Sequence, residues 1–76
     1  MDIKNFKPGI YQHFKGMKYL ALGLARHSET LEWMVTYIPL YDNETAKMWV
    51  RPLDMFYEDV EVDGQKVPRF KFLSET

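Results

Sequence analysis

Turn signals that recur along the chain constrain its fold more than any other feature of the sequence. Short segments rich in Tyr, Leu, Val, Phe and Trp separate them, which is typical of a small antiparallel β domain. The signals are Pro8-Gly9, Lys15-Gly16, His27 to Thr30, Asp42-Asn43 and Asp63-Gly64. We therefore predict strands over residues 10–15, 19–27, 31–38, 48–52, 57–62 and 66–72.

The length of the chain and its lack of cysteine decide what must stabilise such a domain. A chain of 76 residues is enough for one domain, and it buries only about 60% of the surface that its unfolded form exposes. No disulfide or thiolate metal site can add stability. Aromatic residues make up 16% of the chain, and large rings bury roughly 150–250 Å² each. We expect a ring-filled core in a single domain over residues 8–73, with frayed termini at residues 1–7 and 74–76.

Side-chain alternation predicts the register of a first hairpin, which turns at Ser28 and Glu29. One face of this hairpin should form the core, because opposing residues on a strand pair share a face. The expected pairs on that face are Leu24–Trp33, Leu22–Val35 and Leu20–Tyr37.

A second hairpin is predicted at Asp63-Gly64, because glycine accepts the positive φ that a two-residue turn requires. Val60 should then face Val67. Two pairs further from the turn, and on the same face, Glu58 should face Arg69 and form an ion pair that is at least partly buried.

The stretch from Pro52 to Phe56 predicts one helical turn between two strands. Proline suits the first helical position, and Asp54 suits the positive end of the helix. Leu53 and Phe56 would share the side that packs inward. Together with the strand pattern, this predicts an all-β fold, a small SH3-like antiparallel barrel of about five to six short strands with one helical turn.

Charge and motif content exclude several classes of partner. The net charge is −1, which makes nucleic acid an unfavoured partner because its binding requires a basic patch. No apolar run approaches the roughly 20 residues that span a bilayer, and the N-terminal MDIKNFKPG has no apolar region of a secretory signal. Two histidines among scattered carboxylates make a poor metal set. We expect a cytoplasmic protein with no membrane partner, metal or cofactor.

The segment from Arg26 to Thr30 is the first candidate site. In a catalytic interpretation, His27 would be a base, Ser28 a nucleophile and Glu29 an orienting residue. Adjacent residues on a strand point to opposite faces, however, whereas a triad assembles from distant segments. A hairpin tip whose hydroxyls bond local amides is the simpler interpretation, and ligand contact through His27 and Glu29 is the alternative.

Three arginines near aromatic residues form the second candidate site: Arg26, Arg51 and Arg69. Arg51 shares a strand face with Trp49, so that the ring can pack beneath the guanidinium. If the fold brings the arginines to one rim, they would form a cup for a carboxylate or phosphate group, flanked by Tyr37 and Tyr41. Separate ion pairs with Glu29, Glu32 and Glu58 would explain the same pattern, and both interpretations stay open.

Three stretches of the sequence resemble a known family. They are GIYQHFKGMKYLALGLARHSETLE, VTYIPLY and MWVRPLDMFYEDVEVDGQKVPRFKF, with the elements ARHSETLE, WVRP and PRF in that order. Over about Pro8 to Phe72 the chain resembles the small bacterial family catalogued as domain of unknown function 1653. The resemblance implies a stand-alone bacterial cytoplasmic domain with a compact SH3-like barrel, and it implies no activity, substrate or catalytic residue.

The sequence therefore favours a non-catalytic recognition module that binds a peptide or a small anionic ligand. The predicted contact residues are Arg26, His27, Glu29, Tyr37, Tyr41, Trp49, Arg51 and Arg69. One alternative is a small enzyme or enzyme accessory in which His27 acts with Glu29 or Glu32 as an acid–base pair. A second is single-stranded nucleic-acid binding on exposed rings, and a third is a homodimer joined at an exposed strand edge.

Overall fold

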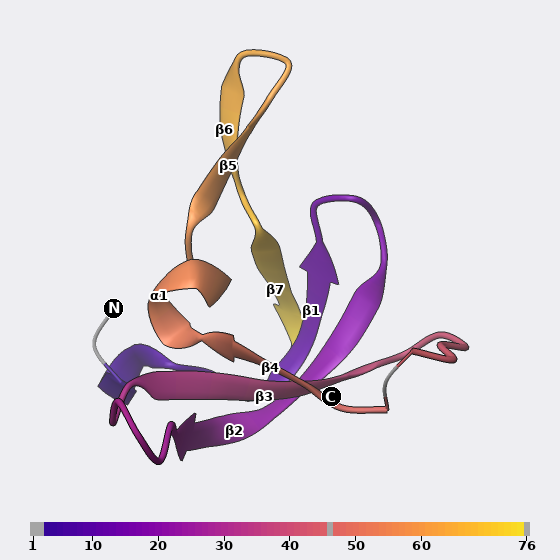
Figure 1. The fold of residues 1–76 in the computed structure, drawn as a ribbon. Coiled ribbons are helices and arrows are strands. Elements are labelled where there is room, and N and C mark those ends of the chain that lie inside the picture. Colours follow the sequence, from indigo (N-terminus) through magenta and orange to yellow (C-terminus); the bar gives the residue numbers. More distant parts are fainter. Residues whose placement is uncertain (1–2, 46, 76) are drawn as a thin grey trace.

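The computed structural model describes residues 3–45 and 47–75, which form a mostly β, antiparallel fold (Figure 1). Seven strands, one short α-helix and one 3-10 helix make up this part of the chain. In chain order they are η1 (Ile3–Asn5), β1 (Gly9–His13), β2 (Lys18–Arg26), β3 (Trp33–Pro39), β4 (Trp49–Pro52), α1 (Leu53–Phe56), β5 (Asp59–Val62), β6 (Gln65–Pro68) and β7 (Phe70–Ser74). This part of the chain contains no helix with the length and apolarity to cross a membrane.

The strands form two separate sheets, so the predicted closed barrel is wrong. A five-stranded sheet has the order β4-β3-β2-β1-β7, and β5 and β6 pair only with each other. The predicted strand over residues 66–72 divides at Arg69: its first half pairs with β5, and its second half pairs with β1. Because of this division the β5–β6 hairpin projects from the sheet as an arm (Figure 1).

Aromatic rings fill the space on one face of the five-stranded sheet, which we call the inner face. The buried side chains are Tyr11, Tyr19, Ala21, Val35, Tyr37, Leu53, Phe56 and Phe70. The rings of Phe56 and Phe70 stack with centroids 4.3 Å apart, and the other ring pairs in this group meet edge to face, as aromatic quadrupoles prefer. The expectation of a ring-filled core is confirmed.

The helical turn lies where the sequence predicts it and covers part of this core. Pro52 ends β4 and precedes the first helical residue, so its fixed φ of −52° starts the turn. Leu53 and Phe56 are both buried, as their three-residue spacing predicts.

The register of the β2–β3 hairpin differs from the predicted one by a shift and a bulge. The loop is two residues longer than predicted, so Leu24 faces Val35 instead of Trp33, and Leu31 within it adopts a positive φ of 62°. The register then shifts again between Ala21 and Gly23, and such a bulge reverses which residues face inward. The predicted inward positions of Leu20 and Leu22 are therefore wrong.

The inward residues in this half of β2 are instead Tyr19 and Ala21, whose side chains are 7% and 1% exposed. Leu22 is 45% exposed on the opposite face.

The β5–β6 hairpin has the predicted register. Asp63 and Gly64 both have positive φ, 51° and 80°, as a two-residue hairpin turn requires. Val60 faces Val67. Beyond the end of the ladder, the amide of Arg69 donates to the carbonyl of Glu58.

Structure is present at both ends where fraying was predicted. Ile3–Asn5 forms the 3-10 helix, and the Phe6 ring meets Tyr57 edge to face at 6.4 Å. The Lys7 carbonyl accepts a hydrogen bond from Tyr11, and Ser74 belongs to β7. The rest of the predicted frayed termini, Met1, Asp2 and Thr76, lies outside the described residues.

Candidate functional site

Arg51 on β4 is held in place by two aromatic side chains. Its Nε donates to the Tyr37 hydroxyl at 3.3 Å, and its guanidinium carbon lies 5.4 Å from the centre of the Phe70 ring. No carboxylate among the described residues pairs with it, whereas its contacts with Tyr37 and Phe70 hold it over the inner face. A guanidinium fixed in this way presents its remaining N–H donors in a fork that suits a carboxylate or phosphate.

Tyrosine hydroxyls extend this cationic position into a polar, ring-lined surface. The hydroxyls of Tyr19 and Tyr41 lie 2.7 Å apart, and the Tyr19 ring packs against Tyr37 at 5.3 Å. Burial, followed by the hydrogen bond to Tyr41, raises the pKa of Tyr19, so its hydroxyl stays protonated. Trp49 pairs with Tyr37 across the ladder and is half-buried against the core. Two predicted site residues, Tyr37 and Trp49, therefore adjoin Arg51, and a third, Tyr41, is joined to Tyr37 through Tyr19.

His13, at the end of β1, lies in a positive environment that the sequence does not reveal. Its ring packs against Phe14 at 4.6 Å and Phe70 at 4.9 Å, and its Nδ1 accepts a hydrogen bond from the Lys15 amide. Burial lowers the pKa of His13 first, and the charges of Arg51, Arg69 and Lys15 lower it further. His13 is thus a neutral imidazole among cations.

Arg69 combines an ion pair with an unsatisfied donor. Its Nη2 lies 2.8 Å from Glu58 Oε1, with 22% and 52% of the two side chains exposed, which confirms the predicted pair. Its Nε is buried and has no partner among the described residues. A buried donor without a hydrogen bond lowers the stability of the fold. Arg69 is therefore largely neutralised, and of the two arginines near His13 only Arg51 has a free charge.

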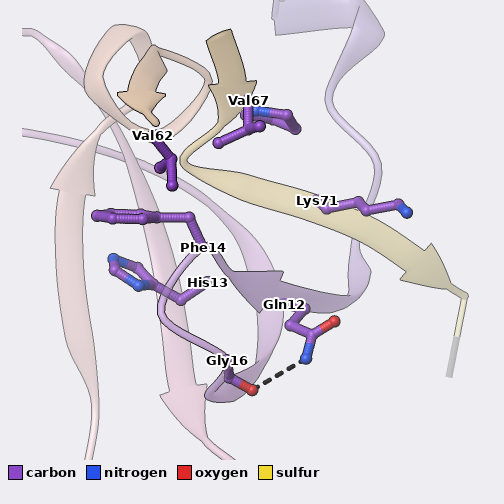
Figure 2. A pocket seen from close by; sticks show the side chains of 8 residues that line it. Gln12, His13, Phe14, Gly16, Val62, Val67 and Lys71 are labelled. Carbon is purple, nitrogen blue, oxygen red and sulfur yellow. Dashed lines mark hydrogen bonds between the residues drawn. The ribbon is translucent and has the colours of Figure 1, made fainter. Parts of the chain in front are cut away.

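A hollow of about 530 Å³ opens on the other side of His13 (Figure 2). It separates the end of β1 and the β1–β2 turn from the β5–β6 arm, and its lining residues are Gln12, His13, Phe14, Gly16, Val62, Val67, Pro68 and Lys71. Phe14 and Val62, which are 37% and 38% exposed, face each other across it (Figure 2). A hydrogen bond from Gln12 Nε2 to the Gly16 carbonyl fixes the turn at its edge. The hollow suits an apolar group next to the cationic surface.

The predicted site residues at the β2–β3 tip do not join this cluster. Arg26 ends β2, whereas His13 and the β1–β2 turn lie near its beginning. The Arg26 guanidinium stacks on Trp33 at 4.2 Å and has no ion pair with Glu29 or Glu32 within the described chain. The predicted cup of three arginines is therefore not formed, because β2 separates Arg26 from the other two.

His27 caps the tip instead of facing a carboxylate. Its Nδ1 accepts hydrogen bonds from the amides of Glu29 and Thr30 at 3.1 and 3.3 Å. All three residues are exposed. The structure thus gives no support for an acid–base pair between His27 and the side chain of Glu29 or Glu32.

Sequence reasoning missed His13, Phe14 and the hollow. The adjacent ring and imidazole before a Lys-Gly turn were a local signal, but the arm that completes the hollow comes from residues some fifty positions later. No group of three or more His, Asp or Glu residues in the described ranges is arranged to hold a metal ion.

The fold and most of the sequence have counterparts among known proteins. The family model described as "Protein of unknown function (DUF1653)" matches residues 9–72. A crystal structure of a protein belonging to DUF1653 from Bordetella bronchiseptica superposes with a TM-score of 0.93 at 40% sequence identity, over 99% of this chain and 96% of that one. No curated protein matches the chain. The chain therefore belongs to the DUF1653 family.

Proposed function

We propose that this protein is a non-catalytic recognition module which binds a carboxylate or phosphate group at Arg51. The ligand is a peptide or a small molecule that carries this anion beside an apolar group. Arg51, Tyr37, Tyr41 and Trp49 contact the anion and its neighbourhood, and the hollow beyond His13 accepts the apolar part. An SH3-like arrangement remains a prediction, and the proposal does not depend on it.

The observation that carries this proposal is the position of Arg51. Its side chain is already ordered by the Tyr37 hydroxyl and the Phe70 ring, so binding would cost little further conformational entropy. Within the described chain no carboxylate competes for it. Ion pairing of a partly desolvated guanidinium is also stronger than at a fully exposed position.

His13 supplies a reporter for binding at this position. Its pKa is lowered in part by the charge of Arg51, so an anion bound to Arg51 should offset that charge and raise the pKa of His13. Tight packing of the imidazole against Phe70 makes its ring signals sensitive to the same site.

The test is an NMR titration of the imidazole ring signals with pH, at constant ionic strength, with two separate probes. Sodium phosphate tests the phosphate source, and the capped peptide acetyl-Val-Glu-Val-amide tests a carboxylate beside apolar side chains. We expect at least one probe to raise the pKa of His13 and to bind about tenfold or more weakly to Arg51→Gln. Arg51→Lys keeps the charge but not the fork and should bind with intermediate affinity.

Arg26→Gln is the matched control, since Arg26 also stacks on a ring but lies at the other end of β2. It should leave both the His13 pKa and probe binding unchanged. If neither probe changes the His13 pKa, or if Arg26→Gln weakens binding as much as Arg51→Gln, the proposed site is wrong.

A further inference from the structure

His13 is a titratable side chain on which cationic residues from three segments of the chain converge. Its ring meets the Phe70 ring edge to face at 4.9 Å, and the guanidinium carbon of Arg51 lies 5.4 Å from the centre of that same ring. The carbonyl of Arg69 accepts a hydrogen bond from the residue that follows His13. Lys15 lies two positions along the chain, and its amide donates to His13 Nδ1. The charges of all three cationic residues act on the imidazole.

Few negative groups balance this positive charge. On the side of the arm, Glu58 pairs with Arg69. On the side of β2, the Tyr19 ring lies 6.5 Å from His13, and burial raises the pKa of its hydroxyl, which therefore carries no charge. Lys71 adds another amine to the lining of the adjoining hollow. No carboxylate among the described residues forms an ion pair with the imidazole itself, so His13 is neutral at neutral pH.

The charges of Arg51 and His13 are coupled through a water-poor region. The Phe70 ring that both side chains contact is 3% exposed, and charges are less screened where water is excluded. An anion bound to Arg51 would offset the charge of the guanidinium, and protonation of His13 would then become more favourable. By linkage, protonation of His13 must strengthen binding of the anion by the same factor.

We propose that His13 takes up one proton from solvent when an anion binds at Arg51, so that the protein binds its ligand more tightly as the pH falls. This proton uptake presupposes the anion site proposed above. The proton adds to Nδ1, because that nitrogen accepts the Lys15 amide in the free protein and so carries the lone pair. The imidazolium then supplies a second positive charge to the site, and the Lys15 amide turns to another acceptor.

The direction of the pH dependence follows from the two states of the imidazole. In the free protein, burial and then the surrounding cations hold the pKa of His13 below its usual value. In the complex, the anion raises it. Above both pKa values His13 is neutral in both states and does not affect affinity. As the pH falls from the higher to the lower value, the complex binds a proton that the free protein lacks, and affinity rises.

The test is the affinity for sodium sulfate at about pH 8 and at about pH 5, measured by NMR titration at constant ionic strength. Sulfate stays a dianion over this range, so a change in affinity comes from the protein and not from the probe. We expect sulfate to bind about tenfold or more tightly at the lower pH, and the pKa of His13 to rise by the corresponding amount in saturating sulfate. The Lys15 amide signal should shift in the same transition, since its acceptor becomes protonated.

His27 is the matched control, because its Nδ1 also accepts hydrogen bonds from local backbone amides but at the β2–β3 tip. Sulfate should not change the titration of its ring signals, and His27→Gln should keep the full pH dependence of binding. His13→Gln, in contrast, should bind sulfate with nearly the same affinity at both pH values. Circular dichroism at both pH values checks that the two variants are folded.

Three results would overturn the proton uptake. One is a pKa of His13 that sulfate does not change, which the wild-type protein alone decides even if His13→Gln does not fold. Another is an equal pH dependence of binding in the wild-type protein and in folded His13→Gln. In both cases, sulfate binding that Arg51→Gln weakens would leave the anion site itself intact. The third is sulfate that does not bind at either pH, and the anion site is then decided by the phosphate and peptide probes.

Discussion

The β5–β6 arm, from Asp59 to Pro68, has no buried residue. The five-stranded sheet and α1, in contrast, bury five aromatic rings. The arm is held by its two-residue turn, its own ladder and the Glu58–Arg69 pair at its base. The sheet is held by rings that pack on one another across β1, β2, β3, β7 and α1. This difference shows that one short chain contains a region whose structure is specified locally and another whose structure depends on burial.

The largest expected effect that separates the two regions is the loss of a core ring. Phe56 is fully buried and stacked on Phe70, so Phe56→Ala should lower the free energy of unfolding by about 3–5 kcal/mol. Val60→Ala in the arm removes a half-buried side chain and should cost about 1 kcal/mol or less. Urea unfolding of both variants checks this contrast. Equal losses would mean that the arm contributes as much to global stability as the core does.

An intermediate effect is expected from two glycines that differ mainly in their surroundings. Gly9 has a φ of 148°, and a Cβ there would collide with the Ser74 carbonyl of β7, so Gly9→Ala should cost about 2–3 kcal/mol. Gly64, with a φ of 80°, has open space around it, and Gly64→Ala should cost about 1 kcal/mol for the backbone alone. Thermal unfolding would show the order. A larger loss for Gly64→Ala would reverse our assignment of which region is packed.

The smallest effect concerns the attachment of the arm. Glu58 is 52% exposed, so its ion pair contributes less than about 1 kcal/mol, and Glu58→Gln should barely change global unfolding. It should, however, speed amide exchange in β5 and β6 relative to β1 and β2, because it loosens the base of the arm. Glu61→Gln, in the exposed ladder pair with Lys66, is the control. If exchange changes equally in all four strands, the arm does not open on its own.

The same contrast explains how much of the molecule the sequence could predict. The register of the arm follows from Asp63-Gly64 alone, because two residues with positive φ fix both strands. The β2–β3 register does not follow, because Leu31 adopts a positive φ that its side chain disfavours and because Gly23 is the only local sign of the bulge after Ala21. If alternation is counted back from the hairpin loop without this bulge, every side chain from Ala21 to the start of β2 is assigned to the wrong face.

The candidate site was predictable where it lies on one hairpin and unpredictable where it joins distant segments. Trp49, Arg51 and Tyr37 were expected together, and the β3–β4 ladder does place them side by side. Arg26 was assigned to the same site because the predicted barrel brought all strand ends to one rim. His13 was not assigned to it, because its neighbours Arg51 and Arg69 come from strands far along the chain.

The extra residue in β2 has a consequence for how the family's sequences are to be aligned. The inward-facing positions of β2 change from odd to even at Leu22. Before it, the odd-numbered side chains face inward, and after it, the even-numbered ones do. Removing that one residue would make the alternation regular and leave Tyr19, Ala21 and Leu24 all inward, because Ala21 and Gly23 already pair with the consecutive residues Tyr37 and Thr36. A gap of one at this point in a relative therefore signals the loss of the bulge with an unchanged interior, whereas a gap of two would turn the first half of the strand over.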